Sequence, residues 1–239
     1  INQNYSQETI IPKKLIPGKS KFSIKKYYFW IPGSTICYRE FLCWRTMQFL
    51  VIEGNIGAGK STLSRMIAED YNAKLVMEQF ADNPFLPKFY KDKERYSFPL
   101  ELSFLADRYN QIKNEVLNLD LFHSFMVADY YFAKTAIFAE NTLKKDEYHL
   151  FRQIFNIIFE SMPKPDLYVY LHSDVNRLMK NIKMRGRDYE QNMDPDYLDK
   201  IGNGYFNFFK QISSFPILII DINGIDFVKN SDHYQQLKS

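Results

Sequence analysis

Residues 51–62 read VIEGNIGAGKST, an apolar run that passes directly into the pattern G-x-x-x-x-G-K-[ST]. The residues of this loop are Gly54, Asn55, Ile56, Gly57, Ala58, Gly59, Lys60, Ser61 and Thr62. Its glycines let backbone N–H groups turn toward a phosphate, and the helix that follows adds the positive end of its dipole. We expect Lys60 to reach the β- and γ-phosphates of ATP and the Ser61 hydroxyl to ligate Mg²⁺. The stretch therefore predicts a nucleotide phosphate loop between a buried strand and a helix.

Outward from this loop, apolar strands and helices alternate along the chain. We expect strands at 49–53, 74–77, 125–128, 167–171 and 217–220, and helices at 61–71, 98–117 and 148–159. The expected strands are short apolar runs, whereas the helices carry apolar residues at helical spacing. Strands separated by helices favour a parallel sheet covered on both faces. The sequence therefore predicts the α/β class: a three-layer α/β/α P-loop NTPase fold with a parallel five-stranded sheet, in one domain over residues 47–239.

The first 46 residues differ in composition from the rest of the chain. They hold eight Lys and Arg against two acidic residues, a net charge of +6, whereas the whole chain carries +3. They contain three prolines and no sustained helical or alternating period. We interpret residues 1–46 as a disordered or non-native extension, such as translated sequence upstream of a start at Met47. The alternative is a genuine small subdomain.

Composition also excludes several classes of protein. The charge of −3 left for residues 47–239 does not provide the basic face of a nucleic-acid-binding protein. No stretch of eighteen apolar residues is present, so we expect no membrane span. Both cysteines, Cys37 and Cys43, lie in the first 46 residues. The main domain therefore has no disulfide framework and no thiolate metal site, which fits a cytoplasmic setting.

Kinases, GTPases and motor ATPases share such a phosphate loop, and the rest of the chain separates them. The chain has no Asn-Lys-x-Asp motif, the guanine-reading motif of GTPases. It has instead an arginine-rich segment at 180–187, after the fourth expected strand. Small-molecule kinases place a cationic lid there, which closes over the phosphates and excludes water. This order of motifs favours a small-molecule kinase with a lid at about 180–190.

Three further stretches give the chain a family resemblance. Residues 78–90 read EQFADNPFLPKFY, residues 165–171 read PDLYVYL, and residues 183–190 read KMRGRDYE. Together with the phosphate loop, and in this order, they resemble the deoxyribonucleoside kinase family over about residues 47–228. The resemblance implies a homodimer of α/β/α subunits, with ATP and Mg²⁺ as the donor pair. It also implies a nucleoside acceptor, phosphorylated for nucleotide salvage.

The resemblance assigns roles to five residues outside the phosphate loop. Glu78 stands at the family's catalytic-base position, and a carboxylate there can accept the proton of a 5′-hydroxyl. Tyr90 and Glu190 match the positions that hold the sugar 3′-hydroxyl. Arg185 and Arg187 match lid arginines that stabilise charge on the transferring phosphoryl group.

The long helix carries the residues expected to read the base. Glu101, Phe104 and Arg108 are spaced i, i+3, i+7 and so share one helix face. Glu101 stands where the family usually has Gln, and a carboxylate only accepts hydrogen bonds. Guanine offers two adjacent donors to a carboxylate, while its O6 and N7 acceptors suit Arg108. This pairing favours a purine acceptor, with deoxyguanosine preferred over deoxyadenosine.

One segment departs from the family pattern. Most members have an Asp/Glu-Arg-Ser/Thr motif after the third strand, but residues 121–132 read LFHSFMVADYYF and contain no arginine. If Asp129 matches the motif's acid, Tyr130 replaces the arginine. If Asp129 matches a base-pocket acid that pairs with Arg108, residues 123–124 replace the acid and the arginine. In both registers we expect Asp129 to face the site, and in both the arginine of the motif is missing.

Two other functions remain open at this point. A nucleoside monophosphate kinase on the same fold would need extra cations for a second phosphate, and the acidic pair Glu78 and Glu101 argues against it. A catalytically weak nucleotide-binding regulator is suggested by the missing arginine. Turnover of nucleosides, turnover of monophosphates, and ATP binding without turnover would distinguish the three.

Overall fold

The computed structural model describes residues 27–30, 47–79, 83–116 and 122–238. Its centre is a parallel sheet of six strands in the order β1-β6-β5-β2-β4-β3. The strands are β1 (Tyr27–Trp30), β2 (Phe49–Gly54), β3 (Lys74–Val76), β4 (Met126–Ala128), β5 (Leu167–His172) and β6 (Ile217–Asp221). The five predicted strands are thus confirmed to within two residues at each end.

Strand β2 lies inside the sheet, and its sequence explains why. All six of its residues are buried, because helices cover both faces of the sheet. It pairs with β4 on one side and β5 on the other, so that Leu50 lies opposite Val127 and Leu167. A continuous apolar run rather than an alternating one is what such a doubly covered strand requires.

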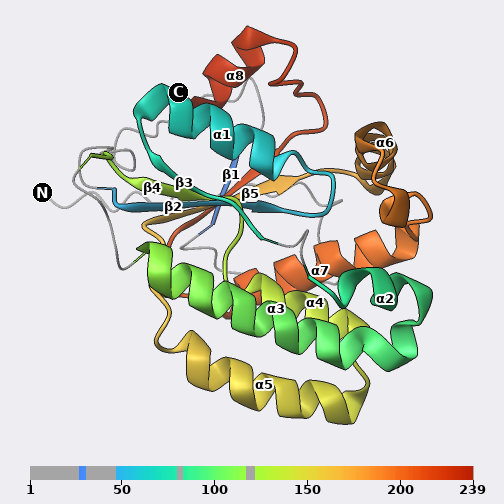
Figure 1. The fold of residues 1–239 in the computed structure, drawn as a ribbon. Helices are drawn as coiled ribbons and strands as arrows, with labels where there is room; N and C mark the ends of the chain where they lie inside the picture. Colours follow the sequence, from blue (N-terminus) through green and yellow to red (C-terminus); the bar gives the residue numbers. More distant parts are fainter. Residues whose placement is uncertain (1–26, 31–46, 80–82, 117–121, 239) are drawn as a thin grey trace, which may run out of the picture.

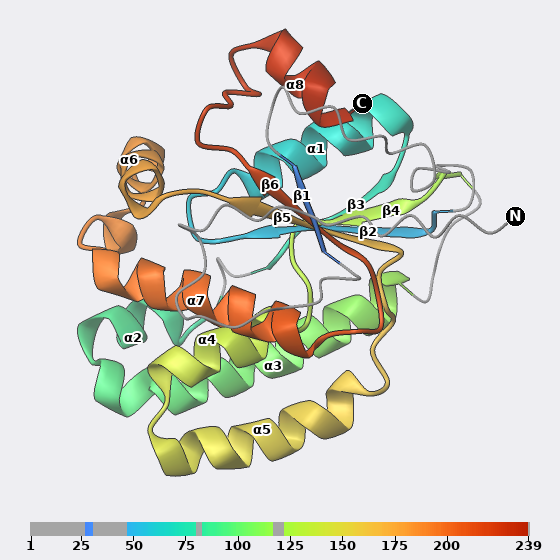
Figure 2. The same ribbon diagram turned by 180° about the vertical axis from the view of Figure 1, so that it is seen from behind.

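Helices form a layer on each side of this sheet (Figures 1 and 2). One layer holds α1 (Lys60–Tyr71) and α8 (Ser231–Lys238); the other holds α3 (Lys93–Val116), α4 (Lys134–Thr142), α5 (Lys145–Phe159) and α7 (Pro195–Gln211). The remaining helices are α2 (Leu86–Lys91), α6 (Val175–Arg185) and the 3₁₀ turn Asp188–Glu190. The three-layer α/β/α fold is therefore confirmed. Among the described residues, no helix is long and apolar enough to cross a membrane.

Aromatic side chains hold the second helical layer against the sheet. Tyr168 of β5 stacks on Phe215 at 5.8 Å between ring centroids, and both rings meet Tyr131 edge-on. Phe132 stacks on Phe155 of α5 at 5.3 Å. Most of the Phe and Tyr side chains that the structure describes thus pack in hydrophobic core clusters.

The sheet has one strand more than the sequence predicts. Residues Tyr27–Trp30 pair in parallel with β6, with Phe29 opposite Ile219. These four residues of the 46-residue extension therefore belong to the sheet, and they pair with backbone groups of β6 that would otherwise be left unpaired at the edge. The other 42 residues of that extension lie outside the described residues.

The long helix begins earlier than expected, at Lys93 rather than at residue 98. Proline is favoured in the first turn of a helix, which is where Pro99 would lie in a helix that starts at 98. The structure instead carries Pro99 inside the helix. Leu100 and Phe104 pack there against Phe89 of α2, and this contact stabilises the turn despite the backbone hydrogen bond that proline removes.

Candidate active site

The phosphate loop joins β2 to α1 at the carboxyl end of the sheet. Gly57 and Gly59 have φ values of 84° and 85°, a left-handed conformation that glycine adopts without strain. A Cβ atom on Gly57 would lie 2.9 Å from the Leu178 carbonyl oxygen, and one on Gly59 would lie 2.9 Å from the Phe227 ring. The two glycines are therefore needed for the close approach of α6 and of Phe227, as well as for the turn.

Lys60 begins α1 and turns back over this loop. Its Nζ donates a hydrogen bond to the Asn55 carbonyl oxygen at 2.9 Å. Burial, and after it the nearby ammonium of Lys134, lower the pKa of Lys60 to about 8, although the carboxylates of Glu53 and Glu78 oppose the change. The Asn55 side chain points away from the phosphate side and donates to the Leu198 carbonyl oxygen of α7 at 2.6 Å. Asn55 thus anchors the loop.

A buried carboxylate stands directly before the loop. Glu53 is completely buried, and it accepts hydrogen bonds from the backbone of Tyr131 and the hydroxyl of Tyr205, each at 2.9 Å. Burial raises the pKa of Glu53, while Lys134 and Lys60 lower it. Glu53 therefore joins β2, the segment after β4 and helix α7 behind the site.

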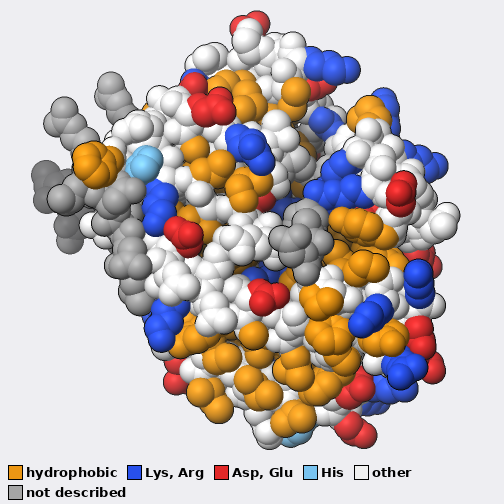
Figure 3. Space-filling model, in the orientation of Figure 1, with side chains coloured by type: hydrophobic (Ala, Val, Ile, Leu, Met, Phe, Trp, Pro, Cys, Tyr) orange, Lys and Arg blue, Asp and Glu red, His pale blue; other side chains and the backbone are white. Residues whose placement is uncertain are grey.

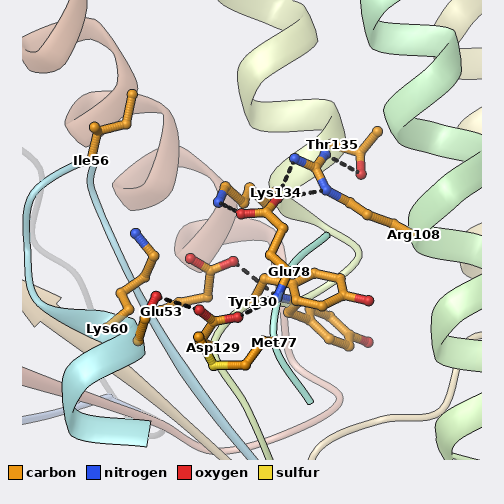
Figure 4. A network of polar contacts seen from close by, with 12 residues as sticks. Glu53, Ile56, Lys60, Met77, Glu78, Arg108, Asp129, Tyr130, Lys134 and Thr135 are labelled. Atoms are coloured by element: carbon orange, nitrogen blue, oxygen red, sulfur yellow. Dashed lines mark hydrogen bonds and ion pairs between the residues drawn. The ribbon is translucent and has the colours of Figure 1, made fainter. Parts of the chain in front are cut away.

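Glu78, two residues beyond β3, is held by two cations (Figure 4). Arg108 of α3 donates to its Oε1 from Nε at 3.0 Å and from Nη2 at 2.7 Å, and Lys134 of α4 donates to its Oε2 at 2.5 Å. Burial alone would raise the pKa of the Glu78 carboxyl, but Lys134 and Arg108 outweigh it and hold this pKa well below its usual range. Glu78 is therefore ionised at any ordinary pH.

Asp129 follows β4 and connects Glu78 to the phosphate loop. Its Oδ1 accepts from the backbone N–H of Glu78 at 2.7 Å, and its Oδ2 accepts from the Ser61 hydroxyl. These contacts favour the register in which Asp129 is the acid of the family motif. Tyr130 does not replace the arginine at the site, because its hydroxyl points to Gln111 of α3, 2.8 Å away. Residues 123–124 precede β4, at the opposite end of the strand.

Ser61 and Asp129 present a hydroxyl and a carboxylate side by side. Such a pair suits Mg²⁺, which binds proteins through one or two oxygen ligands and keeps waters and substrate phosphates as the others. Among the described residues, no group of three or more His, Cys, Asp or Glu side chains could hold a metal ion by itself. A metal here would therefore depend on the nucleotide for part of its coordination.

Glu101 shares the pocket with Glu78 but has a different environment. Its side chain is buried, and Oε1 accepts a hydrogen bond from the Thr142 hydroxyl at 2.8 Å. The other oxygen, Oε2, is buried without a hydrogen-bond partner. Burial raises the pKa of Glu101 to about 7, although Thr142 and Arg108 oppose the rise. Near neutral pH this carboxyl can therefore exist in either protonation state.

The two lid arginines converge on one carboxylate. Arg185 ends α6 and pairs with Oε2 of Glu190, while Arg187 pairs with Oε1 at 3.2 Å. Glu190 is buried, whereas the arginine side chains are about one-third exposed. Tyr90 of α2 lies against Tyr189 at 5.4 Å between ring centroids. The structure thus brings together the predicted sugar-binding residues and the lid.

These side chains line two adjoining hollows at the carboxyl end of the sheet. The first is lined by the predicted acceptor residues Glu78, Tyr90, Glu101, Phe104, Arg108, Asp129 and Glu190, together with Ile56 and Lys134. The second is lined by residues 57–62 of the phosphate loop and by Phe227. Four residues belong to both: Lys60, Ser61, Arg185 and Arg187. Lys and Arg side chains gather on the surface beside α6 (Figure 3).

Sequence reasoning missed Glu53, Lys134 and Thr135. Thr135 accepts a hydrogen bond from Nη1 of Arg108 at 2.8 Å and so fixes the guanidinium against Glu78. One signal was present, because Lys134 is the single charged residue in the apolar run 130–139. A lone charge in a run that must be buried points to a buried partner.

The family model for deoxynucleoside kinases matches residues 50–239. The chain belongs to the deoxynucleoside kinase family. It is 32% identical over 196 residues to a deoxyguanosine kinase of Bacillus subtilis, covering 80% of this chain and 95% of that protein. It is 29% identical over 205 residues to a deoxyadenosine kinase of Lactobacillus acidophilus, covering 80% and 93%. The fold matches that of M. mycoides deoxyadenosine kinase with bound dATP, with a TM-score of 0.70, 24% identity, and coverage of 80% of this chain and 97% of that one.

This deoxynucleoside kinase uses ATP as its phosphate donor, as its family does. Its relatives carry the names of both purine nucleosides at similar identity, so the names do not decide between the two. The kinase differs from the arginine-containing family pattern at residues 129–134, where a lysine five residues beyond Asp129 occupies the site.

Proposed function

We propose that this kinase transfers the γ-phosphate of ATP to the 5′-hydroxyl of a purine deoxyribonucleoside, preferring deoxyguanosine to deoxyadenosine, for nucleotide salvage. The observation that carries the proposal is the buried, unpartnered Oε2 of Glu101 in the same pocket as Glu78. The Glu101 carboxylate is available to the nucleobase, and the Glu78 carboxylate to the reacting 5′-hydroxyl.

Glu78 accepts the proton of the 5′-hydroxyl as that oxygen attacks. Its depressed pKa makes it a weak base, so the proton moves late, when the forming O–P bond has acidified the hydroxyl. A loose phosphoryl transition state tolerates a late proton transfer because bond formation to the nucleophile lags behind departure of the leaving group. Arg108 keeps the carboxylate aimed at the acceptor through two hydrogen bonds.

Cations around the donor hollow stabilise the transferring charge. Lys60 neutralises the β- and γ-phosphates, and Arg185 and Arg187 act from the lid. Both arginines pair with Glu190 in the structure, so a nucleotide phosphate would compete with that carboxylate for them. Glu190 and Tyr90 then hold the sugar 3′-hydroxyl.

Ser61 and Asp129 would hold Mg²⁺ with the nucleotide. The ion would supply charge neutralisation on the β- and γ-phosphate oxygens when bound. Asp129 also accepts the backbone N–H of Glu78, and so it ties the position of the proposed base to that of the phosphate loop.

Glu101, Phe104 and Arg108 read the base. Ionised Glu101 accepts the N1–H and N2–H donors of guanine, whereas adenine presents the N1 acceptor there. Arg108 has five N–H donors and uses three on Glu78 and Thr135, which leaves two for the O6 and N7 acceptors of guanine. The Arg108 guanidinium also lies 4.7 Å from the centre of the Phe104 ring, and both side chains line the pocket that contains Glu101.

A panel of deoxynucleosides and nucleoside monophosphates tests the proposal. At pH 8 we expect kcat/KM to be highest for deoxyguanosine, with deoxyadenosine activity rising toward lower pH as Glu101 becomes protonated. Glu101→Gln should shift the ratio toward deoxyadenosine by about 1–3 kcal/mol, the usual scale of a bidentate base contact. A wild-type preference for deoxyadenosine at pH 8, or an unchanged ratio in the variant, would refute this reading of the base.

We also infer a cytoplasmic homodimer. Leu150 and Ile157 of α5 are 50% and 76% exposed, and with Ile154 they follow helical spacing along one stripe. In the view of Figure 3, apolar side chains gather over the lower half of the surface, where α3 and α5 lie in Figure 1. A second copy of the chain is the occupant expected from the family resemblance. Light scattering measures the molar mass in solution: we expect a dimer for the wild type and a monomer for Ile157→Asp.

A further inference from the structure

Lys134 is a buried ammonium that the proposed reaction has not yet used. It begins α4 and its side chain is 8% exposed. Removing an ammonium from water costs several kcal/mol unless charged and hydrogen-bonding partners compensate. Its Nζ lies 2.5 Å from Oε2 of Glu78, and this pair is one such compensation.

The pairing leaves part of the ammonium available to the pocket. An ammonium carries three N–H donors, and in the described part of the chain Glu78 accepts the single hydrogen bond found for it. Lys134 lines the same hollow as Lys60, Ser61 and Arg185. Those three residues also line the donor hollow, so the Lys134 ammonium, which lies 5.4 Å from the centre of the Phe138 ring, borders the place where the donor and acceptor hollows meet.

The two cations on Glu78 are not equivalent. Arg108 binds Oε1 and is fixed from behind by Thr135 on the neighbouring helix. Lys134 binds Oε2, on the opposite side of the carboxylate from Arg108 (Figure 4). Arg108 is thus held within the helical layer, whereas Lys134 lies between Glu78, the proposed general base, and the phosphate-binding side chains.

We propose that Lys134 is a catalytic residue whose ammonium contacts the transferring γ-phosphoryl group and the acceptor 5′-oxygen. The inference rests on the proposed phosphorylation of a deoxynucleoside. In that step the O5′–Pγ bond forms and the bond from Pγ to the β,γ-bridging oxygen breaks. The 5′-hydroxyl proton goes to Glu78, and ADP leaves with the electron pair. Lys134 keeps its protons and stabilises the negative charge between nucleophile and phosphorus.

A double-mutant cycle separates this role from a merely structural pairing with Glu78. Lys134→Met should lower kcat by about 10²–10³-fold, the usual effect of losing one preorganised donor to a transition state. The decisive comparison is Glu78→Gln against the double variant Glu78→Gln, Lys134→Met. We expect the double variant to be at least tenfold slower. Equal rates would show that Lys134 acts only through Glu78 and would overturn the proposal.

A binding measurement gives a second readout. We expect Lys134→Met to weaken the complex of ADP, aluminium fluoride and deoxyguanosine, measured by calorimetry, at least tenfold more than it weakens ATP binding. Equal weakening of the two would overturn the role in the transition state. Lys200→Met, at an exposed lysine of α7, is the matched control and should change neither quantity.

Loss of stability in the variants and the choice of nucleoside each need a control of their own. If Lys134→Met melts early because Glu78 loses a partner, the double variant remains informative, since it removes both members of the pair. Each rate uses the deoxynucleoside that wild type turns over best. A wild type that phosphorylates no nucleoside would refute the proposed function. An active wild type with a slower Lys134→Met variant bears on the role of Lys134 alone.

Discussion

The substitution Glu101→Gln is expected to make the protein more stable at alkaline pH. Glu101 is 3% exposed, and burial raises its pKa from 4.5 to about 7. A carboxyl whose pKa is higher in the folded chain than in the unfolded chain binds its proton more tightly when folded. Its contribution to stability is therefore complete below pH 4.5 and is lost as pH rises through about 7.

The size of the effect follows from the difference between the two pKa values. Each unit corresponds to 1.36 kcal/mol, so the wild type should lose about 3 kcal/mol of unfolding free energy between pH 4.5 and pH 8 on account of Glu101. The glutamine of the variant would have no proton to lose, and an amide can also donate to a neighbouring acceptor. For a domain of this size the melting temperature should shift by roughly 6–12 °C.

The assay is thermal unfolding without nucleotide or nucleoside at pH values from 4.5 to 8.5. We expect the melting temperature of the variant minus that of the wild type to rise with pH and level off above about 8. Other groups titrate equally in both proteins and cancel from this difference. Glu94→Gln, at an exposed position of the same helix, is the matched control for the change of side chain. A Glu101→Gln difference that does not change with pH would refute the assignment of Glu101 as a buried group titrating near neutrality.

Three other changes test the site and the chain boundary. Lys60→Ala should abolish phosphoryl transfer and leave the circular dichroism spectrum intact, since it removes a charge from the β- and γ-phosphates; near wild-type turnover would contradict the phosphate loop assignment. Glu78→Gln should lower kcat by about 10²–10⁴-fold, more than it raises the acceptor KM; a rise in KM alone would make Glu78 a binding residue. A chain shortened to residues 47–239 should keep its kcat, because all the site residues lie within it. A melting temperature close to that of the full chain would show that β1 adds little stability. Insolubility would show instead that β6 must be paired with β1 to keep the chain soluble.

Local patterns in the sequence were sufficient to predict the strands and the phosphate loop. Residues 49–59 combine a continuous apolar run with glycines at fixed spacing, and each signal depends only on neighbouring residues. The face shared by Glu101, Phe104 and Arg108 was predictable for the same reason, since helical spacing alone places them together.

Contacts between distant residues were not predictable from spacing. The hydrogen bond from Arg108 to Glu78 joins residues 30 positions apart in the sequence, and the one from Lys134 to Glu78 joins residues 56 positions apart. Both depend on how α3 and α4 pack, which helical periodicity does not specify. The pairing of Tyr27–Trp30 with β6 likewise joins segments at opposite ends of the chain, and no local pattern marks it.

The pocket holds two carboxylates whose environments drive their pKa values in opposite directions. Glu78 meets two cations and stays ionised, whereas Glu101 meets a hydroxyl and an apolar wall and titrates near pH 7. Such a divergence commonly separates the roles of two acids in one site. An always-ionised carboxylate beside Lys134 and the phosphate loop suits the hydroxyl that must lose a proton. A carboxyl that can lose or keep its proton at little cost suits recognition of a nucleobase, because the bound nucleobase then determines the protonation state of Glu101. In the proposed function, the two environments orient the nucleoside, with its 5′-end toward Glu78 and the Watson–Crick edge of its base toward Glu101.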